Sequence, residues 1–147
     1  MSLSDAPTGT VFDNFPKPPC AQLLGWTLLE HDAVRGWARI GFEGRPEFLN
    51  PAGSVQGGLL AAMLDDAMGP PALLMSEGAF YTATIDMNVS FLAPARPGRF
   101  IAEGQVVQMG KTVAFLEARL FDGDGTLVAK ASSSARLVPT SKLPSPA

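Results

Sequence analysis

The stretch "NPAGSVQGGLLAAMLDDAMGPP", residues Asn50 to Pro71, holds the long run of good helix formers on which the rest of the fold is arranged. The part from Gln56 to Met68 has no β-branched residue, so it predicts a helix. Pro70 and Pro71 would each remove a backbone donor from that helix and clash with the preceding turn. The helix is therefore expected either to end at about Met68 or to kink and resume through "ALLM".

Strand-like stretches lie on both sides of this helix. Before it, "LLGWTLLEH" and "VRGWARIGFE" are separated by a short polar link and predict a β-hairpin. After it come four strand candidates, which we expect to form a meander: "YTATIDMNVSFL", "GRFIAEGQVVQ", "TVAFLEARLF" and "GTLVAKASSSARLV". An antiparallel sheet with one long helix laid across it gives the class α+β. We expect an N-terminal arm over 1–20, a single domain over 21–138 and a C-terminal tail over 139–147.

Composition narrows the function classes. The chain has 147 residues, enough for one domain, and its charged fraction of 17% beside 46% hydrophobic residues predicts apolar surface buried between subunits. The net charge of −3 offers no field that would gather nucleic acid or coat a membrane. No secretory signal precedes the first strand candidate, and no apolar run approaches the ~20 residues of a membrane span. We therefore expect a cytoplasmic oligomer that binds neither nucleic acid nor membrane.

Metal and disulfide chemistry are not indicated. The single cysteine, Cys20, excludes an internal disulfide and a zinc site of paired thiolates, and it is interpreted as a small, partly buried apolar side chain. The "DGDG" turn lacks a calcium loop's glutamate, because its twelfth position is Ser133. The single histidine, His31, is interpreted as a turn residue rather than a catalytic base. No metal and no redox cofactor is predicted.

The faces of the predicted helix differ in size. At 100° per residue, the bulky side is expected to pack on the sheet, while Asp65 is expected to look out of a slot between small residues. Asp66 points about 100° away, so the two carboxylates are not expected to share a proton. The Asp65 side comprises Gly58, Ala61, Ala62, Met68 and Gly69, and the bulky side comprises Leu60, Met63, Leu64 and Ala67.

The start of the helix presents backbone donors. Two glycines, Gly57 and Gly58, leave the first-turn N–H groups and the positive end of the helix dipole open to an oxyanion. A carboxylate further along, in a site poor in water, has a raised pKa and can act as a base. Such a pair suits acyl transfer. The alternatives are that the glycines only allow tight packing and that Asp65 is exposed or pairs with Arg35 or Arg39; a role for Asp66 is less favoured.

Three motifs follow one another along the chain: N-P-x-G-x-V-x-G-G-x-x-x-x-x-x-D, "TIDMNVSFLAPARPG" and "QMGKTVAFLEARLFDGDGTLVAKASSSARLV". In this combination the chain resembles the hotdog-fold acyl-CoA thioesterases of the phenylacetyl-CoA thioesterase (PaaI-like) group, within the 4-hydroxybenzoyl-CoA thioesterase superfamily. The resemblance runs from about Leu23 to Val138. It implies about six strands wrapped around one central helix. It also implies hydrolysis of acyl-CoA with no cofactor beyond the substrate's coenzyme A, and homodimers with shared sites that pair again into homotetramers.

The resemblance also assigns roles to residues. Asn50 shapes the site, the Gly57 N–H polarises the thioester carbonyl, Asp65 is base or nucleophile, and Thr84 from the neighbouring subunit positions water. The chain departs from the family at Gln56, where "HGG" is common, because a glutamine amide can donate a hydrogen bond but cannot titrate near neutrality.

Substrate contacts are expected in two places. The apolar pocket for an aryl or medium aliphatic acyl group is assigned to Leu59, Met63, Met68 and "GPPALLM", beside Gly58 on the small-residue side. The coenzyme A phosphates are assigned to Lys111, Arg96 and Arg99. Two other functions remain open: a non-catalytic module that binds acyl-CoA, which Gln56 makes credible, and a hydratase or dehydratase, which normally needs a histidine that the motif lacks.

Overall fold

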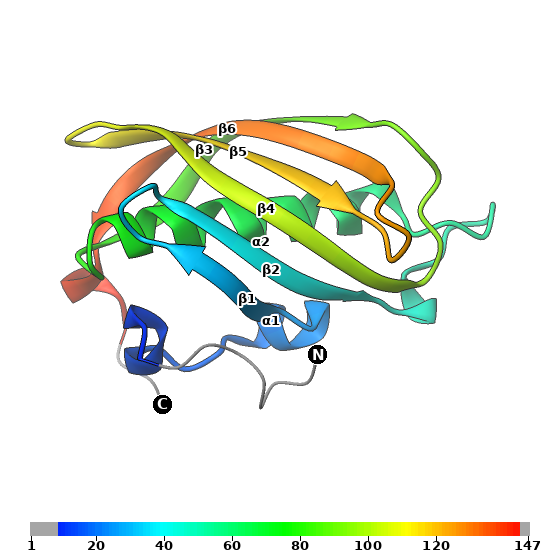
Figure 1. Cartoon of the computed structure of the whole chain (residues 1–147), viewed down its shortest axis with the longest axis horizontal. Helices are drawn as coiled ribbons and strands as arrows, with labels where there is room; N and C mark the ends of the chain where they lie inside the picture. The colour runs from blue at the N-terminus through cyan, green and yellow to red at the C-terminus, as the bar shows by residue number, and fades with distance from the viewer. Residues whose placement is uncertain (1–8, 145–147) are drawn as a thin grey trace.

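The computed structural model describes residues 9–144 as a six-stranded antiparallel sheet curled around one long helix (Figure 1). This confirms the predicted α+β hotdog arrangement. The strands are β1 (Thr27–Asp32), β2 (Trp37–Gly44), β3 (Phe80–Phe91), β4 (Gly98–Met109), β5 (Val113–Phe121) and β6 (Leu127–Pro139). The helices are α1 (Pro19–Leu24) and α2 (Gly57–Met75), with short 3-10 helices η2 (Val11–Asn14), η3 (Pro46–Phe48) and η4 (Thr140–Lys142).

The order of the strands across the sheet is β1-β2-β4-β5-β6-β3. The predicted hairpin is confirmed, because β1 and β2 pair antiparallel. The predicted meander holds only for β4, β5 and β6; β3 pairs with β6 at the far edge. The reason lies in the link between β3 and β4, where Pro94 and Pro97 fix an extended segment that crosses from the sheet edge to its middle instead of turning tightly.

The core lies between α2 and the concave face of the sheet. Met63, Leu64 and Ala67 of the helix are fully buried there, as predicted for the bulky side. Met68, expected on the Asp65 side, is also buried in this core. The sheet side chains that they meet include Ile40, Phe42, Phe100 and Leu120. Each such side chain contributes roughly 1.5–3 kcal/mol by leaving water, so the packing of this one helix face fixes the rest of its surface.

Helix α2 continues through both prolines to Met75, so it does not end at Met68, and the alternative in which the helix includes "ALLM" is observed. Pro70 and Pro71 cannot donate to the carbonyls of Asp66 and Ala67, four residues earlier. The Asp66 carbonyl accepts instead from the indole Nε1 of Trp26, at 3.2 Å. The Ala67 carbonyl lies against Gly104 of β4, where an added Cβ would sit 1.9 Å from its oxygen.

The predicted arm (1–20) and tail (139–147) fall partly outside the described residues. Within the arm, Phe12 of η2 packs edge-on against Trp26 with ring centroids 5.4 Å apart. Two single-residue predictions near this end are wrong. His31 lies inside β1 rather than in the turn that follows it. Cys20 is exposed rather than partly buried, because α1 buries only Ala21 and Leu24.

Candidate functional site

The first turn of α2 is fixed by backbone hydrogen bonds to two loops. The N–H of Val55 donates to the Ala95 carbonyl at 2.6 Å, and that of Gln56 donates to the Phe48 carbonyl at 2.8 Å. Across residues 9–144, no acceptor is found for the N–H groups of Gly57 and Gly58. These two donors, at the positive end of the helix dipole, are therefore free for an oxyanion or a polarised carbonyl.

Side chains flank both glycines closely. A Cβ on Gly57 would lie 3.1 Å from the ring of Phe91, the last residue of β3. A Cβ on Gly58 would lie 2.7 Å from Oε1 of Gln56. Gln56 is exposed and makes no side-chain cap bond, so its amide lies beside Gly58 and uses neither free donor. The glycines thus keep the donors accessible between a ring and an amide.

Asn50 organises the loop that leads into the helix. Its Oδ1 accepts from the backbone N–H groups of Ala52 at 2.9 Å and Ser54 at 3.1 Å. The Asn50 N–H donates to the Ser54 carbonyl at 2.8 Å, which closes the loop. These bonds hold the segment just before Gln56 in one shape. The role of Asn50 in shaping a substrate site stays a prediction.

Asp65 and Thr84 form a carboxylate and hydroxyl pair within one chain. Oγ1 of Thr84, on β3, donates to Oδ1 of Asp65 at 2.7 Å. Thr84 therefore bonds to Asp65 of its own chain, and its role in positioning water for a site shared with a neighbouring subunit stays a prediction. Asp65 is exposed in the single chain, so any dry environment for it has to come from another molecule.

The alternative of an ion pair to Asp65 is wrong. Arg39 pairs with Glu30 and Glu103 instead, the latter at 3.2 Å. Arg35 lies with its guanidinium carbon 5.5 Å from the centre of the Trp37 ring. Neither arginine reaches α2, so the Asp65 carboxylate keeps an oxygen available for a substrate or a water.

Asp66 has a more unusual environment than the sequence indicated. Its side chain is half-buried, and Oδ2 is buried with no hydrogen-bond partner within residues 9–144. Burial, and secondly the neighbouring charge of Asp65, raise the pKa of Asp66 to about 6. Only long-range packing produces this burial, and no signal in the local sequence announces it.

Asp66→Asn is expected to stabilise the fold above pH 6 by about 2 kcal/mol. Because the pKa of Asp66 is raised in the folded state to about 6 from 3.8, the ionised form destabilises the fold, and this cost grows as the pH rises between those values. Part of the carboxyl still reaches solvent, which reduces the effect. Urea unfolding of parent and variant at pH 4 and pH 8 measures it; a gain as large at pH 4 as at pH 8 would contradict the assignment.

The residues predicted to contact substrate are not all brought together. Met63 and Met68 are fully buried in the core, so the surface of this chain does not present them to an acyl group, and their predicted substrate-binding role gains no support. Leu59 is only partly buried, beside the glycines.

The basic candidates lie at opposite ends of β4. Arg96 directly follows Ala95, whose carbonyl holds the entry to α2, and Arg99 lies at the start of β4. Lys111 lies in the turn beyond the other end of this 12-residue strand, ~40 Å away at about 3.4 Å per residue. Within one chain, therefore, Lys111 cannot share a phosphate group with Arg96 or Arg99.

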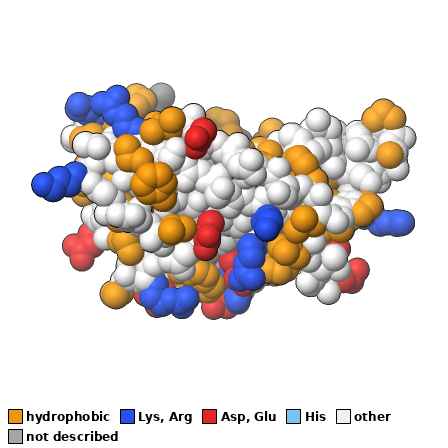
Figure 2. Space-filling model, turned by 90° about the horizontal axis from the view of Figure 1, so that it is seen from above, with side chains coloured by type: hydrophobic (Ala, Val, Ile, Leu, Met, Phe, Trp, Pro, Cys, Tyr) orange, Lys and Arg blue, Asp and Glu red, His pale blue; other side chains and the backbone are white. Residues whose placement is uncertain are grey.

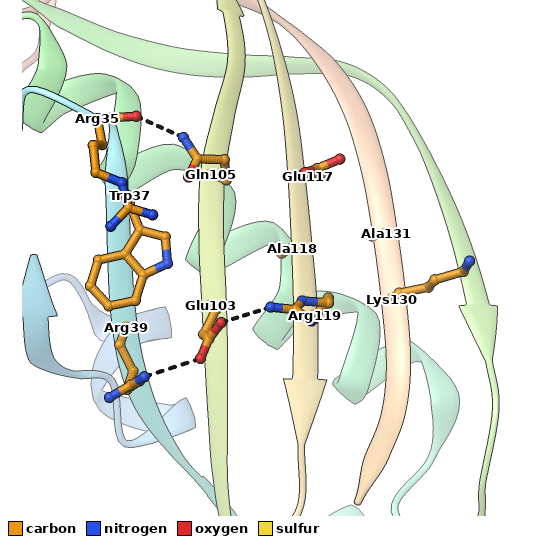
Figure 3. A pocket seen from close by; sticks show the side chains of 10 residues that line it. All are labelled: Arg35, Trp37, Arg39, Glu103, Gln105, Glu117, Ala118, Arg119, Lys130 and Ala131. Carbon is orange, nitrogen blue, oxygen red and sulfur yellow. Dashed lines mark hydrogen bonds and ion pairs between the residues drawn. The ribbon is translucent and has the colours of Figure 1, made fainter. Parts of the chain in front are cut away.

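A charged hollow of about 430 Å³ lies on the outer face of the sheet, with α2 behind it (Figure 3). Glu103 binds both Arg39 and Arg119, the latter at 3.0 Å, so much of the charge is neutralised internally. An adjoining hollow of about 570 Å³ is lined by residues that include Asp86, Phe115 and Ser132. Neither hollow includes Asp65, Gly57 or Thr84. Exposed ion pairs of this kind contribute about 0–1 kcal/mol each, and we interpret them as a solvated surface.

Two further features were searched for in the part of the chain that the structure describes. It contains no group of three or more His, Cys, Asp or Glu side chains placed to hold a metal ion. Among residues 9–144, no helix combines the length and apolar character needed to cross a membrane, α2 included.

Comparisons with known proteins agree with the fold and the helix motif. The family model "Thioesterase superfamily" matches residues 52–129, a range that includes Gly57, Asp65 and Thr84. Human acyl-coenzyme A thioesterase 13 is 33% identical over 86 residues, which is 57% of this chain and 61% of that protein.

Solved structures extend the comparison to most of the chain. A phenylacetic acid degradation-related protein of Ralstonia eutropha JMP134 superposes with a TM-score of 0.76 at 33% identity, covering 86% of this chain and 95% of that one. A Streptococcus mutans protein bound to acetyl CoA superposes with a TM-score of 0.69 at 18% identity, covering 78% and 89%, which compares the fold alone. These matches confirm the resemblance identified from the sequence motifs.

Proposed function

The chain belongs to the thioesterase superfamily and is a thioester hydrolase, and on this premise we propose that its substrate is an acyl-CoA, cleaved to a free acid and coenzyme A. The observation that carries the proposal is that Asp65, which accepts a hydrogen bond from Thr84 of β3, lies on the same helix as the free N–H groups of Gly57 and Gly58. The likeness to human acyl-coenzyme A thioesterase 13 supports this substrate class. In the streptococcal protein, the same fold accommodates acetyl CoA.

In the proposed mechanism the thioester carbonyl oxygen accepts from the Gly57 N–H, with the Gln56 amide assisting. Because Thr84 donates its proton to Asp65, its own lone pairs can accept from a water molecule. Asp65 either removes a proton from that water as the water attacks the carbonyl carbon, or attacks the carbon itself and forms a mixed anhydride that the water then hydrolyses to the free acid. The tetrahedral intermediate then expels the coenzyme A thiolate, which takes up a proton. Each preorganised donor to the oxyanion is worth roughly 3–4 kcal/mol.

One chain cannot complete this site. Asp65 follows Gly57 by eight residues of α2, which separates them by about 12 Å along the helix axis. A carbonyl bound at Gly57 is therefore out of reach of the same chain's Asp65. We infer that the Asp65 and Thr84 pair of one chain works with the Gly57 and Gln56 donors of another, so that two copies form two shared sites.

The edge strand β3 offers the surface for this pairing. It ends the sheet, so its outer backbone groups have no strand neighbour within the described chain, and Tyr81, Ile85 and Phe91 on it are 48%, 61% and 54% exposed. A long apolar edge is an aggregation hazard unless it is covered. Figure 2 shows further apolar side chains spread over the face seen from above. We infer a homodimer, with dimers pairing into a tetramer through remaining apolar surface.

Light scattering at micromolar concentration is expected to give the mass of a dimer or a tetramer. A monomer that hydrolyses acyl-CoA at that concentration would contradict the shared site. A cytoplasmic location stays a prediction from the sequence.

The second candidate function, a non-catalytic acyl-CoA-binding module, is favoured by Gln56 alone. If the family histidine only donates a hydrogen bond, glutamine replaces it adequately, since both side chains can donate. Gln56→His is then expected to leave kcat/KM at pH 8 within about threefold and to add a pH dependence near 6.5. Steady-state kinetics from pH 5.5 to 8.5 measure this. A gain of more than about tenfold would mean that the native site is a weakened one.

A further inference from the structure

Pro70 creates a gap in the hydrogen-bond ladder of α2 that a residue outside the helix fills. The Asp66 carbonyl would normally accept from the N–H of residue 70, which proline lacks. Trp26 Nε1 donates to this carbonyl at 3.2 Å from the segment before β1, 40 residues earlier in the chain. The carbonyl that Pro70 leaves without a helix donor, and that Trp26 binds instead, therefore belongs to the residue directly after Asp65.

We propose that Trp26 is a positioning residue for hydrolysis: its indole N–H holds the Asp66 carbonyl at the Pro70 break and thereby fixes the turn of α2 that carries Asp65. This inference rests on the proposed role of Asp65. It concerns how that carboxylate is aimed, which the proposed function leaves open.

Trp26 is itself held on several sides, as a positioning residue must be. Phe12 of η2 packs edge-on against its ring at an interplanar angle of 61°. The ammonium of Lys17 lies 5.8 Å from the centre of the same ring and also donates to the Trp26 carbonyl. These contacts therefore fix the position of the indole N–H in addition to its bond to the Asp66 carbonyl.

The same turn is constrained from its other side. The Ala67 carbonyl, which Pro71 leaves without a helix donor, lies against Gly104 of β4. Asp65 accepts from Thr84 of β3 at 2.7 Å on a helix that continues through both prolines. A proline ring pushes away the carbonyl four residues before it, so without the indole the Asp66 peptide is free to tilt. Asp65 would then move relative to Thr84.

Trp26→Phe tests the proposal, because phenylalanine keeps an aromatic ring for Phe12 and Lys17 and removes the N–H donor together with the second ring of the indole. We expect kcat for acyl-CoA hydrolysis to fall about tenfold with KM within about twofold, since small misplacements of a reacting group cost rate rather than binding. Trp37→Phe is the matched control, because Trp37 lies on the outer face of the sheet, and it should retain the parent kcat.

Pro70→Ala supplies the missing N–H from the helix itself. In the Trp26→Phe background it is expected to restore kcat to within about threefold of the parent, because residue 70 can then donate to the Asp66 carbonyl. A purely structural role for the tryptophan would not be rescued at this position. A Trp26→Phe variant with the parent kcat, or a loss that Pro70→Ala does not repair, would overturn the proposal and leave the proposed function standing.

Amide hydrogen exchange distinguishes a failure of this inference from a failure of the proposed function. If the parent hydrolyses no acyl-CoA, the proposed function fails, and exchange of the amides in the turn 65–69 then decides the inference. Exchange there should be faster in Trp26→Phe and slow again in the double variant, because the turn opens more often without an anchor. Unchanged exchange rates in Trp26→Phe would overturn the inference that Trp26 fixes this turn.

Discussion

Asp65→Asn is expected to lower kcat for acyl-CoA hydrolysis by about 10³-fold, because an amide can neither accept the proton of water nor attack the thioester carbonyl. The change is nearly isosteric, and an asparagine oxygen can still accept the hydrogen bond from Thr84 that Asp65 accepts at 2.7 Å. The fold and substrate binding should therefore persist. A panel of aryl and aliphatic acyl-CoA thioesters, with release of free thiol as the readout, measures the loss.

Asp66→Asn is the matched control for this experiment. It removes a carboxylate one residue away on the same helix, whose buried Oδ2 has no partner within residues 9–144. At pH 8 it should keep kcat within about threefold of the parent, while its unfolding becomes harder. Asp65→Asn as active as the parent would remove Asp65 from the reaction. A selective loss in Asp66→Asn would instead transfer the role to the buried carboxylate.

The elements of the fold could be predicted from local pattern, and their arrangement only in part. Period-2 stretches and a run of helix formers identified six strands and one long helix, since these signals are local. The position of β3 beside β6 depends on pairing between residues that lie far apart in sequence, from Phe91 with Ala129 to Phe80 with Pro139, for which a single sequence carries no local signal. A resemblance to a known fold supplied the wrapped sheet but not the strand order.

The prolines show why a local rule failed at the helix end. Pro70 and Pro71 each argue for a helix stop, and that holds when nothing replaces the lost donors. Here the Asp66 carbonyl accepts from Trp26 and the Ala67 carbonyl is accommodated by Gly104. Both partners belong to other elements, so the continuation to Met75 is a tertiary effect.

The candidate site divides in the same way. The free donors of Gly57 and the carboxylate of Asp65 follow from residue type and helix spacing. The bond from Thr84 to Asp65 within one chain does not follow from the sequence, because the two residues lie on different elements. With that bond known, the proposed mechanism needs Gly57 of a second copy, because Asp65 lies about 12 Å along the helix from its own Gly57. The burial of Asp66 and the exposure of Asp65 depend on packing that no spacing rule contains.

Gly104→Ala is expected to destabilise the fold by about 3 kcal/mol or more, because the new methyl group enters a space filled by backbone. Its Cβ would lie 1.9 Å from the Ala67 carbonyl oxygen and 3.1 Å from the Pro71 ring. Neither neighbour can rotate away as a flexible side chain does. The helix would have to lift off β4, which loosens the core beneath Met63 and Leu64. A fall in Tm of about 6–12 °C corresponds to this loss.

Gly41→Ala is the matched control, since it adds the same methyl group to the neighbouring strand β2. There the nearest atom is the flexible end of the Arg99 side chain, at 3.1 Å, which can move aside. Its Tm should stay within about 3 °C of the parent, as differential scanning fluorimetry can measure for both variants. Equal melting temperatures for the two would mean that α2 does not rest on Gly104. The close packing of α2 on β4, which we infer accommodates the Ala67 carbonyl that Pro71 leaves without a donor, would then be wrong.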